Sequence, residues 1–139
     1  ERALREIYLQ GFERVIREEQ PMAVMTAYNK VNGIHAANHS GLCNQVLREE
    51  WRFAGLVMTD WAATVSSEDG SCSAAGCMGA GNDLIMPGSE ADVESIQQAL
   101  EQGWLSLDQV KACAFRNIRI ILQTNQYEDA PAYGHQFVN

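Results

Sequence analysis

Two apolar runs of the chain end in side chains whose types could do chemistry. Residues 56–59 lead directly into Asp60 and Trp61, and residues 23–27 lead into Tyr28. A carboxylate at position 60 can attack or stabilise an anomeric carbon, an indole offers an apolar face to a pyranose, and a phenol can hold a carboxylate ionised and oriented. An Asp after a strand is also commonly a helix cap or a loop residue, so spacing alone leaves both interpretations open.

The elements that must position these side chains alternate along the chain. The apolar runs predict short buried strands at residues 23–27, 56–59 and 84–86. Helical spacing and caps predict helices over 1–18, from Ser40 to Gly55, over 72–80, from Ser89 to about residue 100, and from Ser106 onward. Trp51, Phe53 and Trp104 are expected in the core. A polar loop is expected over residues 28–39.

Strands separated by helices favour right-handed βαβ units and a parallel sheet, hence an α/β fold. Three such strands are too few to close a sheet, and their open edges would need covering. We therefore expect a partial (β/α)8 TIM-like barrel of about three parallel strands alternating with helices. The barrel units would occupy residues 1–125, and residues 126–139 would form a tail or linker. In such folds the loops after the strands build the active site.

Composition narrows the classes of partner. The chain has 139 residues and a net charge of −8, so phosphate backbones would be repelled and nucleic acid is not an expected partner. No apolar run reaches membrane-spanning length, which indicates a soluble protein and leaves open cytoplasmic, periplasmic and secreted locations. The four cysteines are expected to be buried and reduced, because their spacing fits neither a zinc site nor a redox motif.

Four stretches resemble motifs of the family 3 glycoside hydrolases, in the family's order. Residues 23–33 resemble its apolar strand followed by a Tyr-Asn-x-x-Asn-Gly loop. Residues 47–61 resemble its Leu-Arg-x-x-Trp-Gly-Phe-x-Gly run ending in Ser/Thr-Asp-Trp, although Arg52 stands where Gly is usual. Residues 81–88 resemble its Gly-x-Asp-x-x-Met-Pro-Gly segment, and residues 1–12 resemble its preceding helix. The β-glucosidase branch fits better than the xylosidase branch.

The resemblance implies a role for each matching residue. Asp60 would be the catalytic nucleophile of a retaining β-glycosidase that hydrolyses terminal β-D-glucosyl residues through a covalent glycosyl-enzyme. Tyr28 would sit against Asp60, Trp61 would line the mouth of the sugar site, and Met25 would supply an apolar wall. A small carbohydrate is the implied partner, and neither a cofactor nor a metal is expected.

Parts of the family's machinery have no counterpart in these residues. The residues that grip the sugar hydroxyls and the general acid/base would come from the rest of a parent chain, so the isolated fragment is expected to be inactive. The alternative is a non-catalytic carbohydrate-binding or structural module derived from the same barrel. Asp83 is interpreted as a structural carboxylate rather than a second catalytic acid. His35 and His39 are interpreted as loop residues rather than metal ligands.

Overall fold

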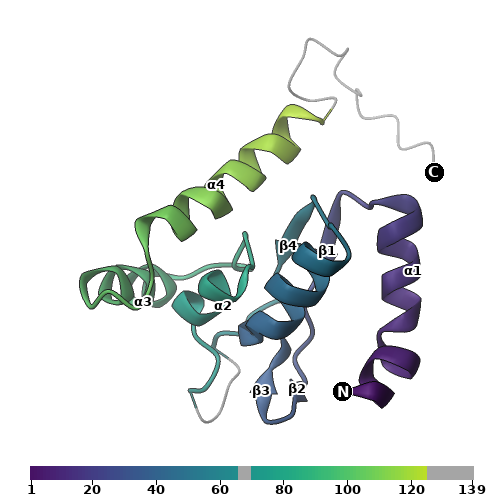
Figure 1. Ribbon diagram of the computed structural model, residues 1–139. Coiled ribbons are helices and arrows are strands. Elements are labelled where there is room, and N and C mark those ends of the chain that lie inside the picture. The colour runs from purple at the N-terminus through teal and green to yellow at the C-terminus, as the bar shows by residue number, and fades with distance from the viewer. Residues whose placement is uncertain (66–69, 125–139) are drawn as a thin grey trace, which may run out of the picture.

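The computed structural model describes residues 1–65 and 70–124. Its helices are η1 (Leu4–Tyr8), α1 (Gln10–Glu19), η2 (Ala36–Asn38), η3 (Gly41–Glu50), α2 (Ala74–Ala80), α3 (Glu90–Glu101) and α4 (Leu107–Leu122). Its strands are β1 (Ala23–Met25), β2 (Lys30–Val31), β3 (Ile34–His35) and β4 (Leu56–Met58). In Figure 1, β1 and β4 lie between α1 on one side and α2, α3 and α4 on the other.

The parallel sheet is small. Strands β1 and β4 pair in parallel through three residue pairs, from Ala23 with Leu56 to Met25 with Met58. The predicted third strand at residues 84–86 is reduced to a single parallel bridge between Met58 and Leu84. The α/β class is therefore confirmed, with three parallel segments side by side, in a molecule that is mostly helical.

The polar loop predicted over residues 28–39 contains a hairpin, so that prediction was wrong in part. Strands β2 and β3 pair antiparallel, with Val31 opposite Ile34. The two residues between them have positive φ angles of 51° at Asn32 and 84° at Gly33. An Asn-Gly pair between apolar residues is the strongest short-range hairpin signal, because this turn requires φ above zero at both central positions.

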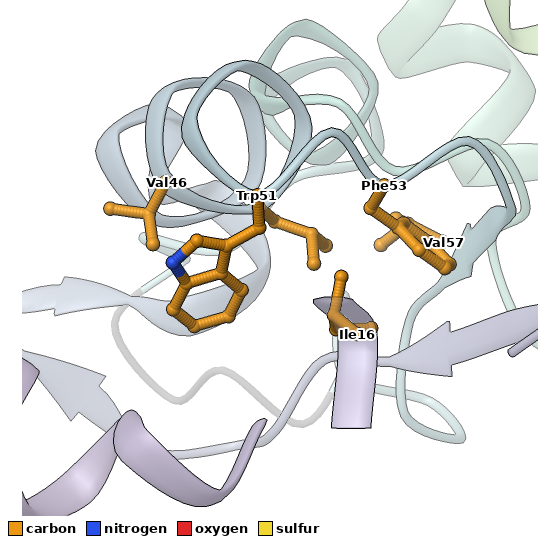
Figure 2. Close-up of a cluster of buried hydrophobic side chains, with 6 residues drawn as sticks. Ile16, Val46, Trp51, Phe53 and Val57 are labelled. Carbon is orange, nitrogen blue, oxygen red and sulfur yellow. The ribbon is translucent and has the colours of Figure 1, made fainter. Parts of the chain in front are cut away.

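One hydrophobic cluster joins α1, η3 and β4 (Figure 2). It consists of Ile16, Val46, Leu47, Trp51, Phe53 and Val57. Trp51 and Phe53 are 5% and 3% exposed, which confirms their predicted core positions. Each large apolar side chain buried in this way contributes about 1.5–3 kcal/mol relative to an exposed one. The cluster packs helix η3 against strand β4, which leads to Asp60.

Two helices keep apolar faces on the surface: α1, with Phe12 and Val15, and α4. Helix α4 leaves Leu107, Ile118 and Ile121 more than half exposed, although helical spacing places them on one apolar face. Trp104 is 84% exposed, so its predicted core position was wrong. Periodicity identifies the apolar face of a helix and not the element that covers it. None of the helices within the described ranges combines the length and apolarity that crossing a bilayer would require.

A buried carboxylate ties three elements together. Asp83, 4% exposed, accepts hydrogen bonds from Arg48 of η3 and Arg116 of α4, each at 2.5 Å, and from the amide of Val57 in β4 at 2.8 Å. The side chain of Asn117 also donates to the carbonyl of Asp83 at 2.7 Å. This geometry confirms the interpretation of Asp83 as a structural carboxylate.

Arg52 follows helix η3 with a φ angle of 60°. This left-handed conformation costs an ordinary residue roughly 1–2 kcal/mol and costs glycine almost nothing, although glycine loses more entropy on folding. We expect Arg52→Gly to raise the free energy of unfolding by about 0.5–1 kcal/mol in urea titrations. The control is Arg52→Ala, which removes the same charge and keeps the strained Cβ. Equal stabilities of the two variants would contradict the backbone explanation.

Candidate active site

Three side chains meet at the carboxyl edge of the small sheet. Tyr28 comes three residues after β1, and Asp60 and Trp61 come directly after β4 and Thr59. Because β1 and β4 are parallel neighbours, their ends lie at the same edge. The Tyr28 hydroxyl donates a hydrogen bond to the carbonyl oxygen of Trp61. The amide of Trp61 donates to Oδ1 of Asp60 at 2.6 Å.

The site is open on its outer side. Asp60 is half-buried, whereas Tyr28 and Trp61 are 49% and 59% exposed. The carboxylate therefore lies at the rim of the sheet and not in the packed interior. Partial desolvation and the negative charge of Asp60 raise the pKa of Tyr28 above its ordinary value. The phenol consequently keeps its proton at neutral pH and can act as a hydrogen-bond donor.

The third parallel segment fixes the turn that follows Asp60. Thr59 is 1% exposed, and its Oγ1 accepts a hydrogen bond from the amide of Met86 at 2.9 Å. The carbonyl of Met86 in turn accepts from the amide of Ala62 at 2.8 Å. Sequence reasoning did not single out Thr59. Its signal was a hydroxyl at the buried end of an apolar run, where a polar group needs a partner.

Buried polar groups connect the ends of β1 and the third segment. Thr26 follows β1 directly, and its Oγ1 donates to Oδ1 of Asn82 at 3.0 Å. The side-chain Nδ2 of Asn82 donates to the carbonyl oxygens of Ala37 at 2.6 Å and Cys77 at 3.0 Å. Asn82 is fully buried, so its three bonds satisfy a group that would otherwise be costly to bury. This network fixes the end of β1 relative to the third parallel segment, and Tyr28 follows two residues after Thr26.

Met25 lies at the last position of β1 and lines an apolar cavity of 520 Å³ with residues from α1 and η3. Tyr28, Asp60 and Trp61 do not line that cavity, so the structure brings these three together and leaves Met25, on the strand that leads to Tyr28, lining a separate cavity. The β2–β3 hairpin adds His35, whose Nδ1 lies 3.1 Å from the carbonyl oxygen of Tyr28.

Within residues 1–65 and 70–124, no three His, Cys, Asp or Glu side chains gather in an arrangement that could hold a metal ion. The groups that the site presents are a rim carboxylate beside an indole and a phenol. Such a carboxylate can act as a nucleophile toward an electrophilic carbon, and the exposed indole can contact an apolar sugar face.

Comparison with known proteins gives concordant results. The family model described as the glycosyl hydrolase family 3 N-terminal domain matches residues 1–120. The chain is 40% identical over 131 residues to β-glucosidase B of Emericella nidulans and 38% identical over 123 residues to an exo-α-(1→6)-L-arabinopyranosidase of Bifidobacterium longum. These matches cover 93% and 88% of this chain, and the chain spans 15% of the length of each relative.

A solved structure shows the same fold. The chain is similar to β-glucosidase 3B of Thermotoga neapolitana in complex with α-D-glucose, with a TM-score of 0.82 and 37% identity. The match covers 93% of this chain and 18% of that one. The arrangement of β1, β4 and the surrounding helices is thus an arrangement found within a larger α/β protein.

Proposed function

We propose, because the chain belongs to the glycosyl hydrolase family 3 N-terminal domain family, that it carries the nucleophile of a retaining β-glycosidase. The intact protein, meaning this chain with the polypeptide that we propose surrounds it, would hydrolyse terminal β-D-glucosyl residues. The observation that supports this proposal best is the position of Asp60 at the rim of a parallel sheet, beside Tyr28 and Trp61.

The proposed reaction has two steps. In the first, a carboxylate oxygen of Asp60 attacks the anomeric carbon, the glycosidic C–O bond breaks, and an acid from elsewhere in the intact protein protonates the leaving oxygen. In the second, water attacks the same carbon, the bond to Asp60 breaks, and the proton of the water passes to the group that acted as the acid, so the sugar leaves with net retention and the Asp60 carboxylate is restored. Trp61 would offer its exposed indole to the sugar, and Met25 would supply an apolar wall nearby. No cofactor takes part.

The rest of the intact protein has two proposed tasks. It would supply the second carboxyl, which retaining chemistry needs about 5–5.5 Å from the nucleophile, and the groups that grip the sugar hydroxyls. It would also complete a (β/α)8 barrel, to which residues 1–125 contribute the late units, with 126–139 as a tail or linker. Covering the exposed faces of α1 and α4 would follow from that completion. The isolated 139-residue chain would then be inactive.

Covalent trapping tests the proposal. A fluorinated glucoside with an activated leaving group forms the glycosyl ester quickly and hydrolyses it slowly, so the ester accumulates. We expect peptide mapping of the intact protein to find the fluoroglucosyl group on Asp60, and Asp60→Asn to take no label. The matched control is Asp108→Asn, on an exposed carboxylate at the start of α4, which should label normally. A non-catalytic carbohydrate-binding or structural module would take no label in any form.

The identity of the sugar is tested by steady-state kinetics of the intact protein. Relatives of comparable similarity are named for glucosides and for an arabinopyranoside. We expect the aryl β-glucoside to give the highest kcat/KM in a panel that includes the arabinopyranoside and the β-xyloside. A higher value for another sugar would overturn the glucosyl assignment and leave Asp60 as the nucleophile.

Tyr28 is proposed to position the turn that carries Asp60, through its hydrogen bond to the Trp61 carbonyl. Tyr28→Phe is expected to lower kcat/KM by roughly 2–10-fold, because one hydrogen bond contributes about 0.5–1.5 kcal/mol net. The phenol donates only while it is protonated, and its pKa is raised. Wild-type activity should therefore lose this contribution only above the ordinary tyrosine range near pH 10. An unchanged alkaline limb in Tyr28→Phe would contradict the role.

A further inference from the structure

Two cysteine thiols lie close together behind the turn that follows Asp60. The sulfur of Cys72, directly before the cap residue of α2, is 3.7 Å from the sulfur of Cys77 inside that helix. Both thiols also donate to Oδ1 of Asn38, Cys77 at 2.9 Å and Cys72 at 3.5 Å. Neither forms a disulfide, and they are 3% and 0% exposed. One amide oxygen therefore holds two thiols in contact with each other.

The packing around the pair keeps the two sulfurs in place. A Cβ at Gly76 would lie 2.5 Å from the Asn38 side-chain nitrogen, so only glycine lets α2 approach Asn38 this closely. The same nitrogen donates to the carbonyl of Ser71 at 3.1 Å, which anchors the segment entering α2. The pair therefore depends on fixed contacts from both sides.

The pair also packs in one cluster with the turn that follows the proposed site. Cys72 and Cys77 belong to a buried cluster with Ala37 and Ala63, and Ile85 packs against that cluster. Ala63 lies three residues after Asp60 and donates its amide hydrogen to the carbonyl oxygen of Asp60 at 3.3 Å. A movement of the sulfurs would therefore change the packing of Ala63, whose amide is bonded to the backbone carbonyl of Asp60.

The other two cysteines differ in kind. Cys43 donates to the carbonyl of Ala36 at 3.5 Å, and burial raises its pKa to about 11. Cys113 donates to the carbonyl of Asn82 at 3.3 Å, and burial raises its pKa as well. The pKa of Cys72 is instead lowered by its contact with Cys77, because the single S–H of Cys77 can turn from Asn38 toward the Cys72 sulfur and stabilise a thiolate there. A thiol that ionises more readily beside a second thiol has the arrangement of an attacking and a resolving cysteine.

We propose that Cys72 and Cys77 form an oxidative modification site that a hydroperoxide converts into a disulfide. With hydrogen peroxide, the Cys72 thiolate attacks one oxygen, the O–O bond breaks, and a sulfenic acid forms while the departing hydroxide takes up the proton that Cys72 had lost and becomes water. The Cys77 sulfur then attacks the Cys72 sulfur, and the sulfenic oxygen leaves as a second water with the Cys77 proton. The pair loses two electrons and two protons, and one hydrogen peroxide becomes two waters. The sulfurs must close from 3.7 Å to roughly 2.0 Å.

Disulfide formation removes both S–H donors from the buried oxygen of Asn38 and draws Cys72 toward α2. An acceptor left without donors in the interior is costly, so the contacts between η2, α2 and the turn at Ala63 must rearrange. We expect glycosidase activity to fall on oxidation and to return on reduction. This activity effect rests on the proposed function, whereas disulfide formation does not.

The test uses hydrogen peroxide on the intact protein, then denaturation in iodoacetamide and cleavage before aspartate, which yields one peptide of residues 69–82 with both cysteines. We expect this peptide to be lighter by two hydrogens and to take no alkyl group, and dithiothreitol to restore two alkylation sites. In Cys72→Ser, Cys77 should stay alkylatable, and in Cys43→Ala with Cys113→Ala the disulfide should form as in wild type.

Two results would overturn the proposal. One is a peptide that still takes two alkyl groups after peroxide has oxidised exposed methionines of the same sample. The other is a sulfinic acid on either cysteine without a disulfide. Both readouts are masses, so they remain decisive if Asp60 takes no fluoroglucosyl label and the proposed function fails. Should the disulfide form without any change in activity, the coupling to the Asp60 turn would be refuted and the modification site would stand.

Discussion

Replacing Asp60 with alanine is expected to lower kcat/KM of the intact protein for an aryl β-glucoside by roughly 10⁴-fold or more, as loss of a covalent nucleophile does in other enzymes. Without the carboxylate no glycosyl ester can form, and the positive charge that develops at the anomeric carbon loses its nearest anion. A 10⁴-fold loss corresponds to about 5.5 kcal/mol of transition-state stabilisation. Initial rates with purified variants measure it.

The same variant allows a test in the opposite direction. Alanine leaves space where the carboxylate stood, and a small anionic nucleophile such as azide can attack from that space. We expect azide to restore turnover in Asp60→Ala and to give a glycosyl azide of inverted configuration, because one displacement replaces two. Asp60 is half-buried at the rim, so thermal unfolding should change little. Near-wild-type activity in Asp60→Ala, or azide products of retained configuration, would contradict the assignment.

Local signals in the sequence predicted most of the helices. Ser89 and Ser106 cap α3 and α4, and each side chain accepts a hydrogen bond from the amide three residues later. At Ser106 the reciprocal bond from its amide to Gln109 completes a capping box. Such caps are predictable because the donor and acceptor lie within one helical turn of sequence. The apolar runs predicted β1 and β4 for a similar reason.

Features that depend on distant residues were harder to predict. Residues 84–86 were expected to form a strand, and only Leu84 makes a parallel bridge, because pairing depends on what lies on the other side. The surface face of α4 shows the same limit, since Ile118 and Ile121 have helical spacing and remain exposed. A known local signal was missed in the Asn32-Gly33 turn.

The candidate site also has features that the sequence predicts and features that it does not. Parallel strands bring their carboxyl ends to one edge, so the proximity of Tyr28 and Asp60 follows from topology alone. The hydrogen bond from Tyr28 to the backbone carbonyl of Trp61 depends on the conformation of the turn after β4, which the order of the strands does not determine. The cluster of Cys72, Cys77 and Ala63 was not predictable from topology either. A residue distant in sequence, Asn38, holds the two cysteines together.

The largest expected loss of stability comes from Asp83. Its side chain is completely buried, and those of Arg48 and Arg116 are 13% and 22% exposed. Burial lowers the pKa of Arg48, and the Asp83 carboxylate opposes that shift because it favours the charged guanidinium. Arg48 also donates to the carbonyls of Gly55 and Gly81. This one guanidinium therefore connects η3 to the residue before β4 and to the segment that leads to Leu84. Removing the carboxylate leaves two cations without their shared anion.

Asp83→Asn is expected to lower the free energy of unfolding of the intact protein by about 3–5 kcal/mol, measured by urea titration. Asparagine offers one acceptor and one NH₂ group in place of two acceptors, so in either orientation a donor faces Arg48 and the Val57 amide or faces Arg116. The matched control is Glu18→Gln, which breaks an exposed pair with Arg14 and should cost less than about 1 kcal/mol. Equal losses in the two variants would show that the buried carboxylate contributes no more than a surface pair, and that the cluster around it holds η3, β4 and α4 together by packing alone.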